Sequence, residues 1–400
     1  MNLQELIVNR NLLVEKIFTD AVSEFKNDFE LAAKLIEPAE RLGLSGNLFR
    51  AYLIHILAHE PNLISTSIEM RGGIIGKSLR EVFLHDIKIL LPIFCGEVTS
   101  DLKIINDYKP TVANSDVAFN NLTRKLENLR DAEKIANIFI EHYKNFGYGD
   151  IATYRAFRWD ALQKNIVGIR HFESIRLDDL IGYAHQKELL TGNTTAFVDR
   201  KPANNVLLVG ARGTGKSSGV KALVNEYYAK GLRLVQITKP QLKYLPDLME
   251  ILRKFLSKRF IIFLDDLSFE ESEAEYKYLK SAIEGGVESR PENVLIYATS
   301  NRRHLIRETW RDRSENNDEI YRDDSTNETI SLSDRFGLII HYYAPTQNEY
   351  LEIIRSMLKR RGIELDDETL RIEGLRWEMS HSGRNGRTAQ QFVNNYLGQH

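Results

Sequence analysis

Residues Gly210–Ser217 have the types and the spacing expected of a loop that binds a polyphosphate. They fit the pattern G-x-x-x-x-G-K-[ST], with three glycines within six residues, followed by a lysine and a serine. Several backbone N–H groups must approach a polyphosphate closely, and a Cβ atom would obstruct that approach. A helix that begins near Lys216 would add unpaired N–H groups and the positive end of its dipole. A glycine turn without a ligand is the alternative, but a predicted strand before the loop and a predicted helix after it favour phosphate binding.

The same pattern predicts what individual side chains of the loop do. Lys216 would reach the β- and γ-phosphates, and Ser217 would bind Mg²⁺. The other residues expected to contact the phosphates are Gly210, Ala211, Arg212, Gly213, Thr214, Gly215 and Ser218.

A metal-bound triphosphate needs a second, acidic anchor at the end of a strand. The apolar run FIIFL at 260–264 is followed by Asp265 and Asp266, and we expect Asp265 to bind the metal ion. The alternative is a helix N-cap or a solvated turn, where aspartate is common. Glu270 and Glu271 lie nearby in the sequence but beyond the strand end, and neither is favoured for this role.

Polar residues also follow the run VLIYA, at Thr299, Ser300 and Asn301. P-loop proteins with one extra strand between the phosphate loop and the acidic strand usually place the following strand between those two. The end of this strand would then lie beside the γ-phosphate, where Asn301 could orient the attacking water. A polar turn is the alternative, because serine and asparagine suit turns.

These residues require a sheet that brings several strand ends together. Short apolar runs alternate with amphipathic helical patterns in the second half of the chain, which predicts a parallel sheet covered on both faces. The helix after the phosphate loop is expected over 216–230, with Gly231 as its end. The expected strands are 205–210, 232–237, 260–264, 294–299 and 337–343.

Length and composition are those of an ordinary globular protein. The chain has 400 residues, enough for two or three domains, and its formal net charge of −2 gives no global attraction to nucleic acid or anionic membranes. Cys95 is the only cysteine, so no internal disulfide can form. We expect a cytoplasmic protein without membrane association, because no signal peptide is visible and no apolar run reaches the ~20 residues that span a bilayer.

The motifs and their order resemble those of AAA+ ATPases, with SLSDRFG at 331–337 and a helical C-terminal segment completing the set. The blocks LDDLIGYAHQKELLTGNTTAF, DDLSFEESEAEYKYLKSAIEGG and LSDRFGLIIHYYAPTQNEYL are similar to a bacterial AAA+ group known as domain of unknown function 815. The resemblance implies an α/β fold: a P-loop NTPase core with a five-stranded parallel sheet, preceded by an α-helical N-terminal domain and followed by a small helical lid. We expect these three domains over 1–170, 171–344 and 345–400.

Carried over by position, the resemblance assigns roles to residues outside the phosphate loop. Ile181 and Gly182 would lie beside the adenine base. Arg335 resembles an arginine finger, which enters the site of a neighbouring subunit, although a local salt bridge is the alternative. Arg387 resembles the lid arginine that contacts the phosphates of its own subunit, with Arg384 as the alternative and an exposed loop as the simpler interpretation.

One position departs from the usual pattern of AAA+ proteins, which place a glutamate after the acidic anchor. Asp266 stands there, with a side chain shorter by one methylene, and a misplacement of ~1 Å can cost ~10²-fold in rate. The departure favours a slow cycle.

The expected function is therefore ATP binding with Mg²⁺ and hydrolysis to ADP and phosphate between subunits of a homo-oligomer, acting on an unknown protein client. Lys216, Asp265, Asp266, Asn301 and Arg335 would carry the reaction. The alternative is a nucleotide-gated binding module that scarcely hydrolyses ATP. Nucleic-acid binding is not favoured, because acidic residues dilute the arginine cluster formed by Arg302, Arg303, Arg307, Arg311 and Arg313.

Overall fold

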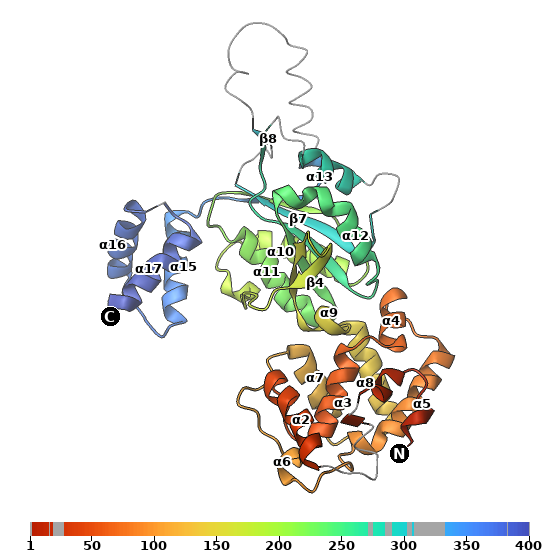
Figure 1. Cartoon of the computed structure of the whole chain (residues 1–400). Helices are drawn as coiled ribbons and strands as arrows, with labels where there is room; N and C mark the ends of the chain where they lie inside the picture. The colour runs from red at the N-terminus through yellow and green to blue at the C-terminus, as the bar shows by residue number, and fades with distance from the viewer. Residues whose placement is uncertain are drawn as a thin grey trace. The chain divides into compact units, whose positions relative to one another are not determined.

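The computed structural model describes residues 2–15, 17–18, 28–270, 275–284, 290–301, 306–307, 333–381 and 383–399. They divide into two compact units (Figure 1). The helical unit comprises Met1–Arg155 together with two short segments, Tyr228–Gly231 and Arg253–Arg259. The sheet unit comprises Ala156–Tyr227, Leu232–Leu252 and Phe260–His400.

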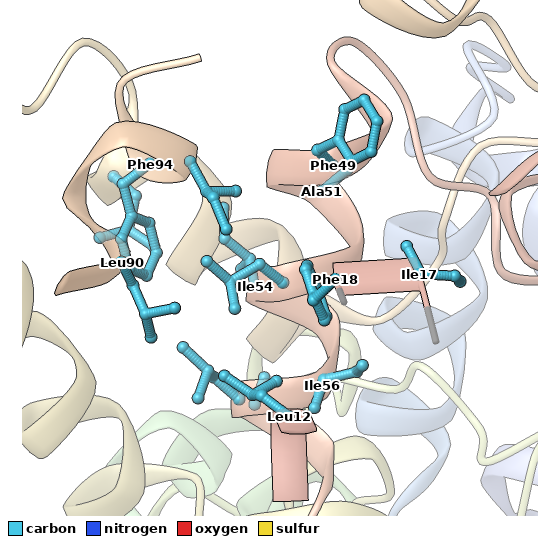
Figure 2. Close-up of a cluster of buried hydrophobic side chains, with 14 of the residues drawn as sticks. Leu12, Ile17, Phe18, Phe49, Ala51, Ile54, Ile56, Leu90 and Phe94 are labelled. Atoms are coloured by element: carbon cyan, nitrogen blue, oxygen red, sulfur yellow. The ribbon is translucent and has the colours of Figure 1, made fainter. Parts of the chain in front are cut away.

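The helical unit is built around a helix that is apolar on all sides, α3 (Leu48–His59). Eight of its 12 residues are buried, and a helix without a polar face is stable only inside a core. Figure 2 shows Ile54 and Ile56 of α3 among Leu12, Phe18 and Leu90 of the same buried cluster. The other helices are α2 (Asp28–Leu42), α4 (Leu63–Met70), α5 (Lys77–Phe94), α6 (Lys103–Asn106), α7 (Val117–Leu126), α8 (Ala132–Asn145) and α9 (Gly149–Thr153), with 3₁₀ turns at Leu3–Glu5 and Arg10–Leu13.

Side-chain caps fix where four of these helices begin. Asn47, Asn62, Asp116 and Asp131 precede α3, α4, α7 and α8, and a side-chain oxygen of each accepts a backbone N–H of the first helical turn. Such a cap is worth about 0.5–2 kcal/mol relative to alanine. The helix starts in this unit are therefore encoded locally.

The sheet unit contains a seven-stranded sheet in the order β2-β1-β4-β5-β7-β3-β9. β3 pairs in parallel with β7 and β9, and β5 pairs in parallel with β7. The prediction that the strand before Asn301 lies between the two motif-bearing strands is confirmed. All five predicted strands are present, as β3 (Val206–Gly210), β4 (Leu232–Ile237), β5 (Arg259–Leu264), β7 (Val294–Ser300) and β9 (Leu338–Tyr342).

The prediction of a five-stranded parallel sheet is wrong in the number of strands, because the sheet has two more, and one of these is antiparallel. β1 (Ala156–Asp160) pairs in parallel with β4, and β2 (Asn165–Gly168) pairs with β1 in the antiparallel direction. Asp160 supports the turn between them, because its carboxylate accepts the N–H groups of Leu162 and Gln163. Both strands lie within 1–170, where we expect helices alone. Strands of five and four residues carry too short an alternation to stand out beside strong helical patterns.

Helices pack on this sheet through apolar faces. Val220, Leu223 and Val224 of α11 (Lys216–Tyr227) share a buried cluster with residues of the strands and of α10 (Ala184–Val198). α11 passes into a 3₁₀ turn at Tyr228–Lys230 before Gly231, so the helix expected over 216–230 is regular only to Tyr227. The remaining elements are α12 (Leu245–Arg253), α13 (Glu275–Glu284), the short strands β6 (Phe269–Glu270) and β8 (Ile306–Arg307), and 3₁₀ turns at Leu177–Asp179 and Lys239–Tyr244.

The residues after β9 form three helices, which we call the lid. They are α15 (Gln347–Lys359), α16 (Asp367–Met379) and α17 (Gly386–Gln399). Tyr350 and Ile354 of α15 pack with Leu370 of α16 and Phe392 of α17 in a hydrophobic cluster. The lid belongs to the same compact unit as the sheet. Among the described residues, no helix combines the length and the apolar character needed to cross a bilayer.

Candidate nucleotide-binding site

The phosphate loop connects β3 to α11, and its three glycines meet different demands. All have positive φ angles, 134° at Gly210, 73° at Gly213 and 84° at Gly215, which glycine adopts most readily. A Cβ at Gly210 would lie 1.8 Å from the carbonyl oxygen of Tyr342, and one at Gly213 would lie 2.4 Å from Asn385 Oδ1. Gly210 therefore serves the close pairing of β3 with β9, and Gly213 serves the approach of the lid. These two contacts are further demands for glycine, beside the predicted close approach of an anion.

Lys216 is the first residue of α11 and is 6% exposed. Its ammonium group donates to the carbonyl oxygens of Gly210 (2.9 Å) and Ala211 (2.7 Å) and to Asn301 Oδ1 (3.1 Å). Burial lowers the pKa of Lys216, while the charges of Asp266 and Asp265 act in the opposite direction. Within the part of the chain that the structure describes, all three groups in hydrogen-bond contact with this ammonium are neutral.

Asp265 lies directly after β5, opposite the start of α11. Its Oδ1 atom accepts hydrogen bonds from Ser217 Oγ at 2.5 Å and from Thr299 Oγ1 at 2.7 Å. The Thr299 hydroxyl also accepts the backbone N–H of Asp266 at 2.9 Å. Thr299 thus fixes both aspartates from the neighbouring strand β7. The two residues predicted to bind Mg²⁺, Ser217 and Asp265, are in direct contact.

Asp266 has a left-handed backbone conformation, with a φ of 53°. Such angles are uncommon outside glycine but are tolerated by aspartate and asparagine, and they concentrate at functional sites. The Asp266 Oδ1 atom accepts a hydrogen bond from Asn301 Nδ2 at 2.5 Å. Because Asn301 also accepts from Lys216, its amide connects the lysine of the phosphate loop to the second aspartate.

These groups line one cavity of about 830 Å³ between the sheet and the lid. Its lining joins a polar side to an apolar side, as a site for a nucleotide requires. The polar side includes Arg212, Gly213, Thr214, Gly215, Lys216, Ser217, Ser218, Asp265, Asp266, Thr299 and Asn301. The apolar side includes Ile175, Leu180, Ile181, Ile353, Met357 and Val393.

Sequence reasoning found most of the polar side and little of the apolar side. Ile181 lines the cavity, but Gly182 is absent from its lining, as are Gly210 and Ala211. Ile353 and Met357 lie on the lid helix α15, whose four-residue spacing of apolar side chains predicts an apolar face but not what that face covers. Val393 lies on the lid helix α17, so three of the apolar residues come from the lid. No sequence motif marks these three residues.

The two candidate lid arginines differ in their surroundings. Arg387 lines the cavity at the start of α17. Arg384 lies outside the cavity lining and pairs with Glu378, with Nε and Oε1 3.2 Å apart. The backbone N–H of Gly386 donates to the carbonyl oxygen of Gly213 at 2.9 Å, which joins the start of α17 to the phosphate loop. Of the two candidate arginines, Arg387 is the one that lines the cavity.

Arg335 does not line the cavity, and it forms an ion pair with Glu284 of α13. This contact matches the alternative of a local salt bridge. Of the other residues considered, Glu270 lies in β6. Glu271, Arg302, Arg303, Arg311 and Arg313 lie outside the described residues.

The donor set fits a Mg²⁺ ion. Magnesium in nucleotide sites is usually held by one or two protein oxygens together with substrate phosphates and waters. Ser217 supplies a hydroxyl oxygen and Asp265 a carboxylate oxygen, and Thr299 restrains that carboxylate from the side of the sheet.

A search of solved structures finds proteins that match part of this chain. The RuvB Holliday junction branch migration motor of Thermotoga maritima is 19% identical over 55% of this chain and 63% of its own, less than two thirds, with a TM-score of 0.37. C. elegans PCH-2 is 16% identical over 57% of this chain and 66% of its own, with a TM-score of 0.39. The FIGL-1 AAA domain in complex with ADP is 18% identical over 55% of this chain and 72% of its own, with a TM-score of 0.38.

No curated protein matches the sequence. A family match covers residues 152–400, which include every residue of the cavity lining. The matched family is described as "Protein of unknown function (DUF815)", and this chain belongs to it.

Proposed function

We propose that this protein binds ATP together with Mg²⁺ and hydrolyses it to ADP and phosphate, using the energy to change conformation on a protein client. The observation that carries the proposal is the convergence of four groups on one cavity. These groups are the phosphate loop, the Asp265–Ser217 pair, the Asn301 amide and the lid residue Arg387.

The residues of the cavity divide the work of phosphoryl transfer in this proposal. Lys216 and the N–H groups at the start of α11 bind the β- and γ-phosphates, and Arg387 adds a positive charge from the lid. Ser217 and Asp265 hold Mg²⁺, which neutralises charge on the phosphate oxygens when it is bound. Asp266 accepts a proton from the attacking water, and Asn301 positions that water. The apolar wall around Ile181 binds the base.

Calorimetry on the purified full chain tests the binding step. We expect one ATP to bind per chain in the presence of Mg²⁺, and Asp265→Ala to weaken binding when Mg²⁺ is present but not in its absence. An intact fold with no nucleotide uptake would refute the proposal.

The proposal includes a homo-oligomer in which Arg335, which resembles an arginine finger, enters the site of a neighbouring subunit. An arginine supplied in this way is worth ~10³–10⁵ in rate in GTPases. Arg335→Ala and Lys216→Ala proteins are each expected to be inactive, but mixing them should restore part of the activity at mixed interfaces. No recovery from assembled mixtures would refute the shared site and place Arg335 in its ion pair with Glu284 alone.

A second candidate function is a nucleotide-gated binding module with little hydrolysis. Two features of Asp266 favour the binding module. Its short side chain places the carboxylate farther from the position of a glutamate carboxylate, and the 2.5 Å contact with the Asn301 amide restrains that carboxylate. Steady-state turnover below ~10⁻³ s⁻¹, near the intrinsic rate of Ras, with and without nucleic acid and cell extract, would favour the module over the enzyme.

A further inference from the structure

Two short segments of the helical unit continue directly into the elements that carry the candidate site. Tyr228–Gly231 follows α11, which begins at Lys216, and Arg253–Arg259 leads into β5, which ends immediately before Asp265. The N–H of Arg259 donates to the carbonyl oxygen of Gly231 at 3.0 Å, so the two segments are joined to each other.

The first segment is anchored in the helical unit by Tyr228. Its hydroxyl donates to the carbonyl oxygen of Ala152, and its ring packs against Phe146 with the centroids 5.4 Å apart. Tyr228 is 3% exposed and belongs to a buried cluster with Ala118, Phe146 and Ala152.

The second segment is anchored by a buried ion pair. Lys258 Nζ lies 2.7 Å from Glu69 Oε1, and the two side chains are 0% and 2% exposed. The same ammonium donates to the carbonyl oxygens of Tyr143 (2.9 Å) and Lys144 (3.0 Å) at the end of α8, where a helix carries partial negative charge. Ser257 completes the arrangement, because its hydroxyl accepts from Lys258 at 2.6 Å and donates to Glu69 Oε2 at 2.5 Å.

The surrounding backbone is shaped to this pair. Gly147 has a φ of 92°, and a Cβ there would lie 2.7 Å from Glu69 Oε1 and 3.1 Å from Lys258 Cε. Glu69 lies near the end of α4, so the pair fixes residues 257–258 to two helices at once. A buried ion pair of this kind contributes little net stability compared with apolar residues of similar size. Its presence therefore calls for a role other than stability.

β5 offers a means of transmitting such a role. All six of its residues are buried, and Phe260 to Leu264 pair in register with β7. A strand of this length spans about 20 Å, and it connects residue 258 to the two aspartates through continuous backbone. We expect a shift at its start to be carried along this backbone to its end.

We propose that Glu69 and Lys258 are positioning residues for nucleotide turnover. By holding the start of β5 against α4 and α8, they set the position of the Asp265 and Asp266 carboxylates relative to the phosphate loop. The expected effect on turnover rests on the proposed function. The placement of the carboxyl end of β5 does not, and it can be measured without nucleotide.

The test uses the full chain with Glu69→Leu and Lys258→Met together. Removing both partners leaves no unpaired buried charge, and such replacements are often neutral or stabilising. The matched control replaces an exposed pair of the same residue types in the same unit, Lys125→Met with Glu141→Leu, whose side chains are 42% and 56% exposed. Each protein is measured for the Kd of ATP with Mg²⁺, for kcat and for the midpoint of urea unfolding.

We expect the buried double variant to lose on the order of tenfold to a hundredfold in kcat, with the Kd and the unfolding midpoint maintained. The control should keep all three values. A folded double variant with the kcat of the wild type would overturn the inference. If the double variant does not fold, Ser257→Ala takes its place with the same two outcomes, since it removes only the hydroxyl shared by the pair.

A wild-type protein without nucleotide binding or turnover would refute the proposed enzyme, and hydrogen exchange would then decide the inference alone. The peptide 259–267 should exchange faster at its carboxyl end in the buried double variant than in the wild type and the control. Equal exchange in all three proteins would overturn the inference.

Discussion

Two buried lysines show how differently the two units use a positive charge. Lys258 of the helical unit is fully buried and contacts the carboxylate of Glu69 in addition to backbone carbonyls. Lys216 of the sheet unit is almost as buried, but the three groups it contacts are neutral oxygens. Burial opposes the charge of both ammonium groups, and among the residues that the structure describes only Lys258 has a countercharge in contact with it.

The difference distinguishes a completed charge pair from a site prepared for an anion. Lys258 needs nothing further, because its charge and its donors are matched within the helical unit. Lys216 holds a positive charge at the edge of a cavity, and a phosphate would supply the missing countercharge there. A substitution at Lys258 should therefore lower the stability of the fold, whereas a substitution at Lys216 should lower the affinity for the ligand.

The largest expected effect is that of Lys258→Met alone. The substitution leaves Glu69 buried without its partner, which typically destabilises a protein by about 3–5 kcal/mol. Urea unfolding followed by circular dichroism measures the loss, and Glu69→Leu in the same chain should recover most of it. A single variant as stable as the wild type would show that water reaches the Glu69 carboxylate and that the pair is not closed.

Lys216→Met should have the converse result. Loss of a hydrogen bond to a charged group costs about 1.5–3 kcal/mol, on the order of tenfold to a hundredfold, here measured in the affinity for ATP. The unfolding midpoint should stay equal to that of the wild type or rise, since the substitution removes a buried charge that has no carboxylate in hydrogen-bond contact. If Lys216→Met loses as much stability as Lys258→Met, the two lysines are alike and the proposed site loses its main physical support.

Asp266→Asn should change ATP hydrolysis without changing ATP binding, so it tests the two steps separately. Asparagine has the same shape and tolerates the left-handed backbone at this position, so the fold and the affinity for ATP should be maintained. Turnover should fall by ~10² if Asp266 accepts the proton from water. Single-turnover kinetics with radiolabelled ATP measures this step. Unchanged turnover would assign the proton transfer to another group.

The sequence predicts the sheet unit better than the helical unit, for identifiable reasons. The phosphate loop, Asp265 and Asn301 each follow an apolar run, so their strands and their meeting point are predictable from local pattern. The need for glycine at Gly210 is not, because the atom it would otherwise strike belongs to Tyr342 on a strand far along the chain. The same holds for the lid residues of the apolar wall.

The Glu69–Lys258 pair had no signal in the sequence at all. Glu69 and Lys258 are charged residues in segments that carry no recognisable motif. No sequence pattern connects α4 to the segment before β5. Likewise, β1 and β2 are too short for periodicity to separate them from the helices before them. Long-range contacts between isolated residues are the part of this fold that local patterns do not carry.

The last prediction concerns acid, whose effect is spread over several pH units and also distinguishes the two units. His55 and His142 lie in the helical unit, and burial lowers the pKa of each to about 3. An unfolded chain binds a proton at each histidine below about pH 6.5, whereas the folded chain does not until about pH 3. The fold should therefore lose stability as the pH falls from about 6.5 toward 3, by up to about 1.4 kcal/mol per pH unit for each histidine.

Other charged groups act on these rings, and the prediction includes them. For His142 they are Asp116, His59, Lys258 and Lys125, and for His55 they are His59, Asp116 and Arg41. Urea unfolding between pH 7 and pH 4.5 measures the loss, with His142→Phe as the test variant and the exposed His85→Phe as its control. The pH dependence should become shallower in the first variant and remain as in the wild type in the second. Since the groups involved all belong to the helical unit, hydrogen exchange at acid pH should rise there before it rises in β3, β5 and β7, and the reverse order would show that the sheet unit is the weaker of the two.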